Sequence, residues 1–197
     1  MDGQESYNKQ EVMDCSTDYF GGDDFAASTW MKKYCLKDGN DFKEKSPDDT
    51  LHRMAREFHR VESMYSPKGN RVSEYGKKRK ELTEDKIYSY FKDFAEIVPA
   101  GSVLSGAGTK NLVSLSNCFV IGSPEDSYDS IMKVRNYQVQ LMKRRGGCGY
   151  DMSKLRPRGA RVNNAANTST GAASFMDVNS DITNEVAQEG RRESVLN

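Results

Sequence analysis

Residues 112–149, LVSLSNCFVIGSPEDSYDSIMKVRNYQVQLMKRRGGCG, decide the fold class. The segment 112–121 ends in an apolar run and predicts a β-strand. The segment 123–126, Ser-Pro-Glu-Asp, is typical of a helix start, and the helix is expected to reach about Arg145. The glycines of 146–149 tolerate the left-handed conformation at a helix end, and a short strand is expected after them. Strand, helix and strand in this order favour βα units around a parallel sheet or a barrel.

The residues before Pro99 carry a different pattern, in which apolar side chains recur at helical spacing. One helix is predicted near 25–35, a second after Ser46 and a third after Thr83. The second has the clearest start, because a proline suits its first position and two aspartates follow at the positive end of the helix dipole. The sequence therefore predicts a helical part followed by a β/α part.

The segments outside these helices are polar. Residues 1–22 are expected to be a disordered tail, because Gln, Ser, Asn, Asp and Gly dominate and no apolar period appears. Residues 65–81, which include a basic run, are expected to form a solvated connector between two helices.

The charges of the chain balance, with 29 Lys and Arg against 29 Asp and Glu. Nucleic-acid-binding proteins usually carry a basic excess, so no nucleic-acid partner is expected. No run of about 18 apolar residues occurs, so no membrane span is expected. The polar first twenty residues lack the apolar centre of a secretion signal, and a reduced, cytoplasmic protein is the prediction.

Cys118 lies inside the predicted strand and has two interpretations. As a lone cysteine it is a small buried hydrophobe. As a redox thiol it needs a second cysteine within disulfide reach, and the spacing of Cys15, Cys35, Cys118 and Cys148 identifies no partner. The same spacing matches neither a zinc cluster nor a dense disulfide framework.

Three further patterns are weak indications of chemistry. His52 and His59 share a face of one predicted helix but lie about 10 Å apart, so no metal site is expected. The glycine-rich stretch 101–110 lacks the spacing of a phosphate-binding loop, and an ordinary loop is predicted. The glycines of 146–149 leave backbone N–H groups accessible, which suits a substrate or an anion as well as a helix end.

From about Phe25 to Arg192, a series of motifs in one order resembles the start of a ribonucleotide reductase large (catalytic) chain. The motifs are Trp30–Tyr34, Ser105–Thr109, Ser114–Ile121, Pro124–Ser127, Met142–Gly149, Leu155–Gly159, Thr168–Gly171, Ser174–Met176 and Gln188–Arg192. The sequences MKRRGG and TSTGAASFM are most similar to those of the adenosylcobalamin-dependent class. The iron- or manganese-dependent class is the alternative.

The resemblance implies an α+β fold, with a helical N-terminal domain over 23–98 and the first strands and helices of an incomplete, ten-stranded-type α/β barrel over 99–192. Family members reduce the ribose 2′-carbon of a ribonucleotide by thiyl-radical chemistry, which supplies DNA precursors. Adenosylcobalamin, or a metal-radical partner subunit in the alternative class, generates the radical. A cysteine pair supplies two electrons and is reduced again by thioredoxin or glutaredoxin.

The same resemblance assigns the substrate-binding residues. Cys118 matches the first member of the redox cysteine pair and faces the substrate. Asn117 occupies the neighbouring substrate contact, and Gly147 matches a substrate-contacting glycine. Ser102 falls near another substrate-contact position. Cys148 stands where an aliphatic residue is usual, so a packing role is expected.

The family also binds a deoxynucleoside triphosphate as a specificity effector. The resemblance assigns Asp126, Ser127 and Tyr128 to this site, at a predicted helix start, and Arg156 in the following loop. An acid beside a helix N-terminus suits a sugar hydroxyl and a phosphate. An arginine suits a phosphate through paired hydrogen bonds. A homodimer through the effector-site helices is a further implication.

The radical-bearing cysteine and the second redox cysteine of the family lie beyond the end of this sequence. Residues 193–197 also diverge from the Gly-Ala-rich continuation of the family. We therefore expect part of a ribonucleoside-diphosphate reductase that is inactive alone and needs the remainder of the reductase chain. The alternative is a non-catalytic nucleotide-binding or interaction module, or an inactive remnant.

Overall fold

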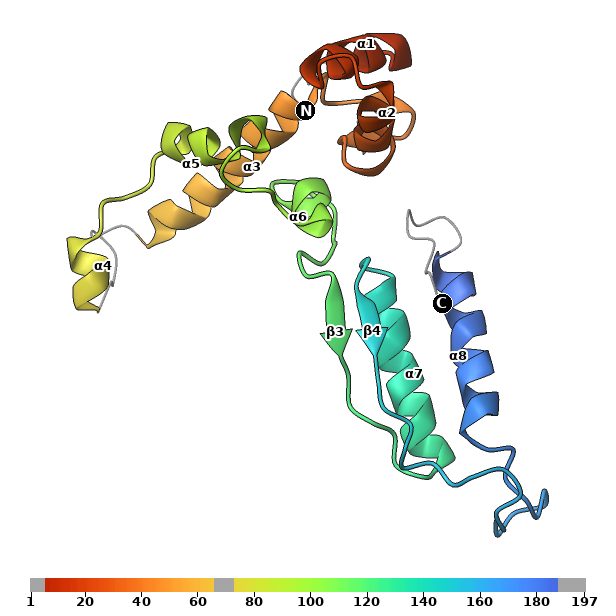
Figure 1. Ribbon diagram of the computed structural model, residues 1–197. Helices are drawn as coiled ribbons and strands as arrows, with labels where there is room; N and C mark the ends of the chain where they lie inside the picture. Colours follow the sequence, from red (N-terminus) through yellow and green to blue (C-terminus); the bar gives the residue numbers. More distant parts are fainter. Residues whose placement is uncertain (1–5, 66–72, 188–197) are drawn as a thin grey trace. The chain divides into compact units, whose positions relative to one another are not determined.

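The chain folds into two units, Met1–Asn111 and Leu112–Asn197, each with its own secondary structure (Figure 1). The computed structural model describes residues 6–65 and 73–187. No helix in these ranges is long and apolar enough to cross a membrane. The break between the units falls later than the predicted boundary at 98/99. The reason is that Leu104 is buried in the core of the first unit and keeps the segment around it there.

The first helix, α1 (Lys9–Tyr19), corrects the prediction of a disordered tail over 1–22. Asn8 caps the helix by accepting backbone N–H bonds, which supplies the start signal. Val12 and Ser16, four residues apart, are its fully buried side chains. Two inward positions are too few to produce an apolar period, so the sequence pattern gave no indication of the helix. Residues 1–5 of the predicted tail lie outside the described ranges.

A small core is formed by side chains of α1, of the helix α2 (Asp24–Lys33) and of the segment that follows α2. That segment contains an antiparallel hairpin of β1 (Lys37–Asp38) and β2 (Asp41–Phe42). The helix predicted near 25–35 is thereby confirmed. The buried apolar residues of this core are Val12, Trp30, Met31, Cys35 and Phe42.

The main helix of the first unit is α3 (Pro47–Met64), which begins where the sequence predicts. The Asp49 carboxylate accepts the Ser46 backbone N–H at 3.2 Å, so the bond that closes the helix start comes from the first turn of α3. Against α3 pack α5 (Glu84–Phe91), the 3₁₀ turn η1 (Lys92–Phe94) and α6 (Gly101–Gly106). The buried apolar residues that join these helices are Leu51, Met54, Ala55, Ile87, Phe91, Leu104 and Ala107.

Two segments predicted as irregular contain short helices. The polar connector 65–81 includes α4 (Glu74–Lys78), which is capped by Ser73. The glycine-rich stretch 101–110 was predicted as a loop, but its first six residues form α6. The burial of Leu104 against α3 stabilises this turn of helix despite its low intrinsic propensity.

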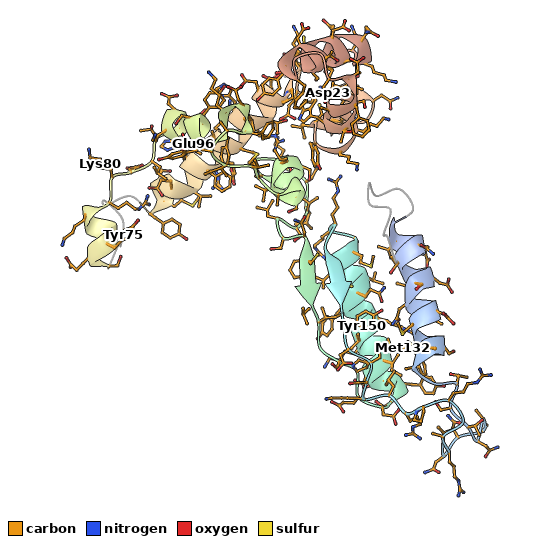
Figure 2. All side chains as sticks on the ribbon, viewed as in Figure 1. Asp23, Tyr75, Lys80, Glu96, Met132 and Tyr150 are labelled. Carbon is orange, nitrogen blue, oxygen red and sulfur yellow. The ribbon has the colours of Figure 1, made fainter. Side chains whose placement is uncertain are left out.

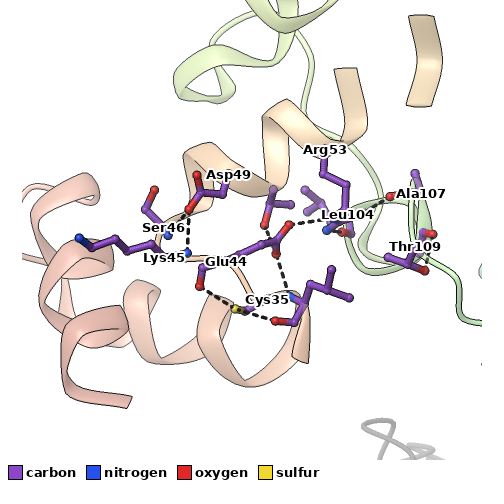
Figure 3. Close-up of polar contacts among 12 residues, drawn as sticks. Cys35, Glu44, Lys45, Ser46, Asp49, Arg53, Leu104, Ala107 and Thr109 are labelled. Carbon is purple, nitrogen blue, oxygen red and sulfur yellow. Dashed lines mark hydrogen bonds and ion pairs between the residues drawn. The ribbon is translucent and has the colours of Figure 1, made fainter. Parts of the chain in front are cut away.

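A buried ion pair between Glu44 and Arg53 ties the first unit together (Figure 3). Arg53 Nε donates to Glu44 Oε1 at 2.7 Å, and both side chains are almost fully buried. The other guanidinium nitrogens donate to the carbonyl oxygens of Leu104, at 2.8 Å, and of Ala107. The second carboxylate oxygen of Glu44 accepts from the Thr50 hydroxyl at 2.8 Å and from the Leu36 N–H at 2.7 Å.

Gly108 lets the chain pass closely over this pair. Its φ of +73° lies in the region that favours glycine. A Cβ at this position would lie 2.9 Å from Arg53 Cγ and 3.0 Å from the Arg53 carbonyl oxygen. Any larger residue would push the segment after α6 away from the guanidinium that holds it.

The second unit is built on a βαβ arrangement of β3 (Cys118–Val120), α7 (Tyr128–Met142) and β4 (Gly147–Gly149). The two strands pair in parallel, as the sequence predicts, and α8 (Ala172–Ala187) follows beside α7 (Figure 1). Three details differ from the prediction. The strand is shorter than 112–121, α7 begins after the cap Ser127, and the glycines form β4 themselves.

The register of the parallel pair separates Cys118 from Cys148. Cys118 lies opposite Gly147, and Phe119 lies opposite Cys148. Paired residues share a face of the sheet and neighbours alternate, so the two cysteines point to opposite faces. The Phe119 ring occupies the space beside Gly146, where a Cβ would meet it at 2.8 Å, at the end of α7. Cys148 therefore shares the face that α7 covers, and Cys118 lies on the other face, where it is exposed.

A polar seam joins α7 to α8. The Gln138 amide donates to the Asn179 carbonyl and to the Thr183 hydroxyl, both at 2.9 Å. All three side chains are buried. Arg135 adds a hydrogen bond from Nε to Asn179 Oδ1 at 2.9 Å. These directional bonds fix the register of the two helices.

Replacement of Arg53 by Met is predicted to destabilise the first unit by about 3–5 kcal/mol, because Glu44 is left buried without its cation. Urea unfolding followed by the fluorescence of Trp30, the single tryptophan of the chain, measures this effect. Trp30 is a suitable reporter because its Nε1 donates to the Thr50 hydroxyl beside the pair. In the matched control, Arg60→Met removes an exposed pair with Glu57 and should leave the midpoint unchanged. Equal midpoints for both variants would contradict the prediction.

The thiols are predicted to react with a disulfide reagent in a set order. Cys118 is exposed and should react first. Cys35 should react last, because burial raises its thiol pKa to about 12, with the nearby Glu44 charge adding to the shift. Cys118→Ser should abolish the fast phase, and Cys15→Ser should retain it. A fast phase that survives Cys118→Ser would contradict the predicted order, because another thiol would then be the most accessible one.

Candidate functional site

The residues predicted to contact substrate belong to both units. Ser102 lies in α6 of the first unit and is buried. Asn117, Cys118 and Gly147 lie together in the parallel pair of the second unit. The Asn117 carbonyl oxygen accepts the Gly147 N–H at 2.7 Å, and Cys118 is opposite Gly147 in register. Three of the four predicted substrate residues are therefore neighbours across one short sheet.

The Cys118 face of this sheet is open in the second unit. Val120, two residues further along β3, is 95% exposed, and Cys118 is exposed as well. The interpretation of Cys118 as a small buried hydrophobe is therefore wrong for this unit. A thiol on an open sheet face can meet a ligand or another thiol, which is the arrangement that a redox cysteine needs.

Cys148 has the opposite environment. It is half-buried on the helix-covered face, and burial raises its thiol pKa. Tyr150, which follows β4 and is labelled in Figure 2, is also half-buried, and burial is the main cause that raises its pKa. A thiol kept protonated among apolar groups is a poor nucleophile, which agrees with the packing role expected for Cys148.

The predicted effector residues Asp126 and Arg156 meet in the second unit. Arg156 Nε donates to Asp126 Oδ2 at 2.5 Å, and the Arg156 backbone N–H donates to Oδ1 at 3.3 Å. The hydrogen bond from the guanidinium lowers the pKa of the Asp126 carboxyl group, which keeps it ionised near neutral pH. Arg156 Nη1 also donates to the Arg161 carbonyl oxygen at 2.9 Å.

The strand topology explains this meeting. Asp126 follows the carboxyl end of β3, and Arg156 follows the carboxyl end of β4. Because the strands are parallel, both ends lie at the same edge of the sheet, where ligands bind in open α/β sheets. The fold therefore places an acid and a cation side by side although they are thirty residues apart in the sequence.

The other two predicted effector residues lie at the start of α7, where Ser127 is the cap and Tyr128 is the first helical residue. Ser127 caps the helix through its hydroxyl, which accepts the Ser130 N–H at 3.3 Å. Tyr128 is exposed, and its ring makes an edge contact with Phe175 of α8, with centroids 6.0 Å apart. Two exposed polar side chains and the positive end of a 15-residue helix thus adjoin the Asp126–Arg156 pair.

Glu125 and Lys154 form a second ion pair in this place that the sequence reasoning missed. Lys154 Nζ lies 2.5 Å from Glu125 Oε1. The signal that could have identified the pair is its spacing, since Glu125 precedes Asp126 by one residue and Lys154 precedes Arg156 by two. Only the parallel pairing of β3 and β4 makes that spacing meaningful.

The two histidines of α3 contact residues of and just before α5. The His52 ring stacks on Tyr88 with centroids 3.9 Å apart, and His59 Nδ1 lies 2.9 Å from the Leu82 carbonyl oxygen. Within residues 6–65 and 73–187, no group of three or more His, Cys, Asp or Glu side chains is placed to hold a metal ion.

Comparison with known families gives two consecutive matches. Residues 20–111 match the family model described as ribonucleotide reductase, all-alpha domain. Residues 116–196 match the model described as ribonucleotide reductase, barrel domain. The junction between the two matches coincides with the division between the two structural units.

Curated relatives agree with this result. A vitamin B12-dependent ribonucleoside-diphosphate reductase of Mycobacterium tuberculosis (strain H37Rv) is 29% identical over 167 residues, which are 85% of this chain and 22% of the relative. The enzyme of that name in Thermoplasma acidophilum is 35% identical over 95 residues, 48% of this chain and 12% of the relative. A ribonucleoside-diphosphate reductase subunit alpha of Helicobacter pylori (strain 26695) is 27% identical over 110 residues, which are 56% of this chain and 14% of the relative.

The chain spans about a fifth of the Mycobacterium relative, and it covers the helical domain and the start of the barrel domain. The predicted fold class is therefore confirmed: α2–α6 lie within the matched helical domain, and the βαβ unit of β3, α7 and β4 lies within the matched part of the barrel domain. With both domain models matched in consecutive order, the chain belongs to the ribonucleotide reductase large-chain family.

Proposed function

We propose that this chain is the N-terminal part of a ribonucleoside-diphosphate reductase of the adenosylcobalamin-dependent class, carrying an effector site and one member of the redox cysteine pair. The observation that carries the proposal is the Asp126–Arg156 pair. An acid and an arginine, thirty residues apart, are joined at the carboxyl edge of a parallel sheet beside the start of α7. That arrangement can hold a sugar hydroxyl and a phosphate of one nucleotide.

The substrate side of the proposal rests on Asn117, Cys118 and Gly147. In the proposed reaction the 2′-hydroxyl of the ribonucleotide leaves as water and a hydrogen replaces it. Cys118 and a second cysteine supply the two electrons and become a disulfide, which thioredoxin or glutaredoxin reduces again. Cys148 is unsuited to be that second cysteine because it points to the opposite sheet face, so we place the second cysteine in the remainder of the reductase chain.

Adenosylcobalamin supplies the radical in this class. Following the family resemblance, we assign the cofactor to the remainder of the reductase, and we derive no step through it here. The names of the Mycobacterium and Thermoplasma relatives favour this class, and that of the Helicobacter relative keeps a metal-radical partner subunit as the alternative. We place the enzyme in the cytoplasm.

A second candidate function is a non-catalytic nucleotide-binding module. One observation favours it: Asp126, Ser127, Tyr128 and Arg156 all lie in the second unit. These residues need no group from the remainder of a reductase to adjoin one another. The candidate differs from the first in predicting nucleotide binding without any contribution to turnover.

The effector site is tested by isothermal titration of the chain with each of the four deoxynucleoside triphosphates. Saturable binding is expected, and Arg156→Met should weaken it about fivefold, because one charge-assisted contact to phosphate is lost. Arg60→Met is the matched control, since it removes an exposed arginine that pairs with Glu57 in the first unit. Absence of binding, or equal weakening by both variants, would refute the assignment.

Turnover separates the two candidates. The 197 residues alone should not reduce a ribonucleotide. Co-expression with the C-terminal remainder of the Mycobacterium relative, assayed with adenosylcobalamin and thioredoxin, should yield deoxyribonucleotide. Cys118→Ser should abolish multiple turnover in that assembly, and Cys15→Ser should preserve it. Reduction by the isolated chain would overturn the proposed function, and an inactive assembly that still binds nucleotide would favour the second candidate.

A further inference from the structure

Two ion pairs connect the same two segments of the second unit, and one of them has no assigned role. Asp126 pairs with Arg156, and Glu125 pairs with Lys154. The acids are adjacent in the segment before α7, and the cations are two residues apart in the segment after β4. Lys154 therefore stands next to the predicted phosphate-binding arginine.

The segment that carries Lys154 is basic. Residues 151–161 contain Lys154, Arg156, Arg158 and Arg161 against one acid, Asp151. The Asp151 carboxylate is held by the backbone N–H and the hydroxyl of Ser153, both at 2.8 Å. The segment itself therefore carries a net positive charge, and two of its cations, Lys154 and Arg156, are paired with Glu125 and Asp126 before α7. A triphosphate carries several negative charges, more than Arg156 can balance alone.

The Glu125–Lys154 pair is suited to exchange partners. Lys154 is 53% exposed and Glu125 is 69% exposed, whereas the Asp126–Arg156 pair is about one-third exposed. Exposed pairs are weak and screened by salt, so a polyphosphate can take Lys154 from Glu125 at little cost. Lysine reaches a phosphate as a flexible point charge and needs no fixed geometry to do so.

We propose that Lys154 is a second cation for the polyphosphate of a deoxynucleoside triphosphate, and that Glu125 holds it until the ligand arrives. The inference rests on the proposed effector site and adds a binding residue to it. Glu125 acts as a competitor of the phosphate. Its removal therefore strengthens ligand binding, and removal of Lys154 weakens it.

Two substitutions of the same pair distinguish binding from a structural role. Isothermal titration with inorganic tripolyphosphate and with dTTP should show that Lys154→Met raises the Kd about threefold. Glu125→Gln should lower the Kd by a similar factor, because Lys154 is released. Both effects should shrink in 1 M salt, where the screening length is about 3 Å. Lys154→Arg should restore the affinity of the unmodified chain.

The control is Lys133→Met, which removes an exposed lysine from the same unit, on α7, and should leave both Kd values unchanged. If the pair only anchors the loop, Lys154→Met and Glu125→Gln break the same contact and both weaken binding, which would overturn the proposal. Unchanged affinity in both variants would overturn it as well. If the unmodified chain binds dTTP and the variants give either of these results, only the role of Lys154 is refuted and the effector site stands. If the unmodified chain binds no nucleotide, the proposed effector site is refuted as well.

Discussion

The first unit depends on the buried pair of Glu44 and Arg53. A charge placed in a low-dielectric interior is costly unless hydrogen bonds surround it, and here each side chain has several partners. Because Arg53 also holds two carbonyl oxygens at the end of α6, it links α3 and the hairpin segment to the helix that carries Ser102. The pair thus connects the core of the helical domain to a predicted substrate residue.

The second unit depends on the parallel pairing of β3 and β4. A βαβ unit brings the carboxyl ends of its strands to one edge, and the residues that follow these ends are Asp126 and Arg156. The same pairing places Cys118 on the open face and Cys148 on the face covered by α7. One topological feature therefore determines both the proposed effector site and the chemical difference between the two cysteines.

Family membership and the proposed chemistry of this chain rest on different observations. Membership in the ribonucleotide reductase family follows from two consecutive domain matches over most of the chain. The proposed chemistry follows from particular contacts, and it divides between the units. The proposed effector residues adjoin one another inside the second unit, whereas the proposed role of Cys118 also requires a second cysteine that we place outside it.

The sequence by itself determined the capped start of α3, the succession of helical and β/α parts, and the family, because caps, apolar periods and motif order are local properties of the chain. It missed α1, since the helix buries only Val12 and Ser16, and it placed the break between the units too early, since burial of Leu104 is a tertiary event. The residues Asp126 and Arg156 were predicted individually, but their contact and the neighbouring Glu125–Lys154 pair were decided by the tertiary structure. The reason is that proximity across thirty residues arises from strand pairing, which no local pattern encodes.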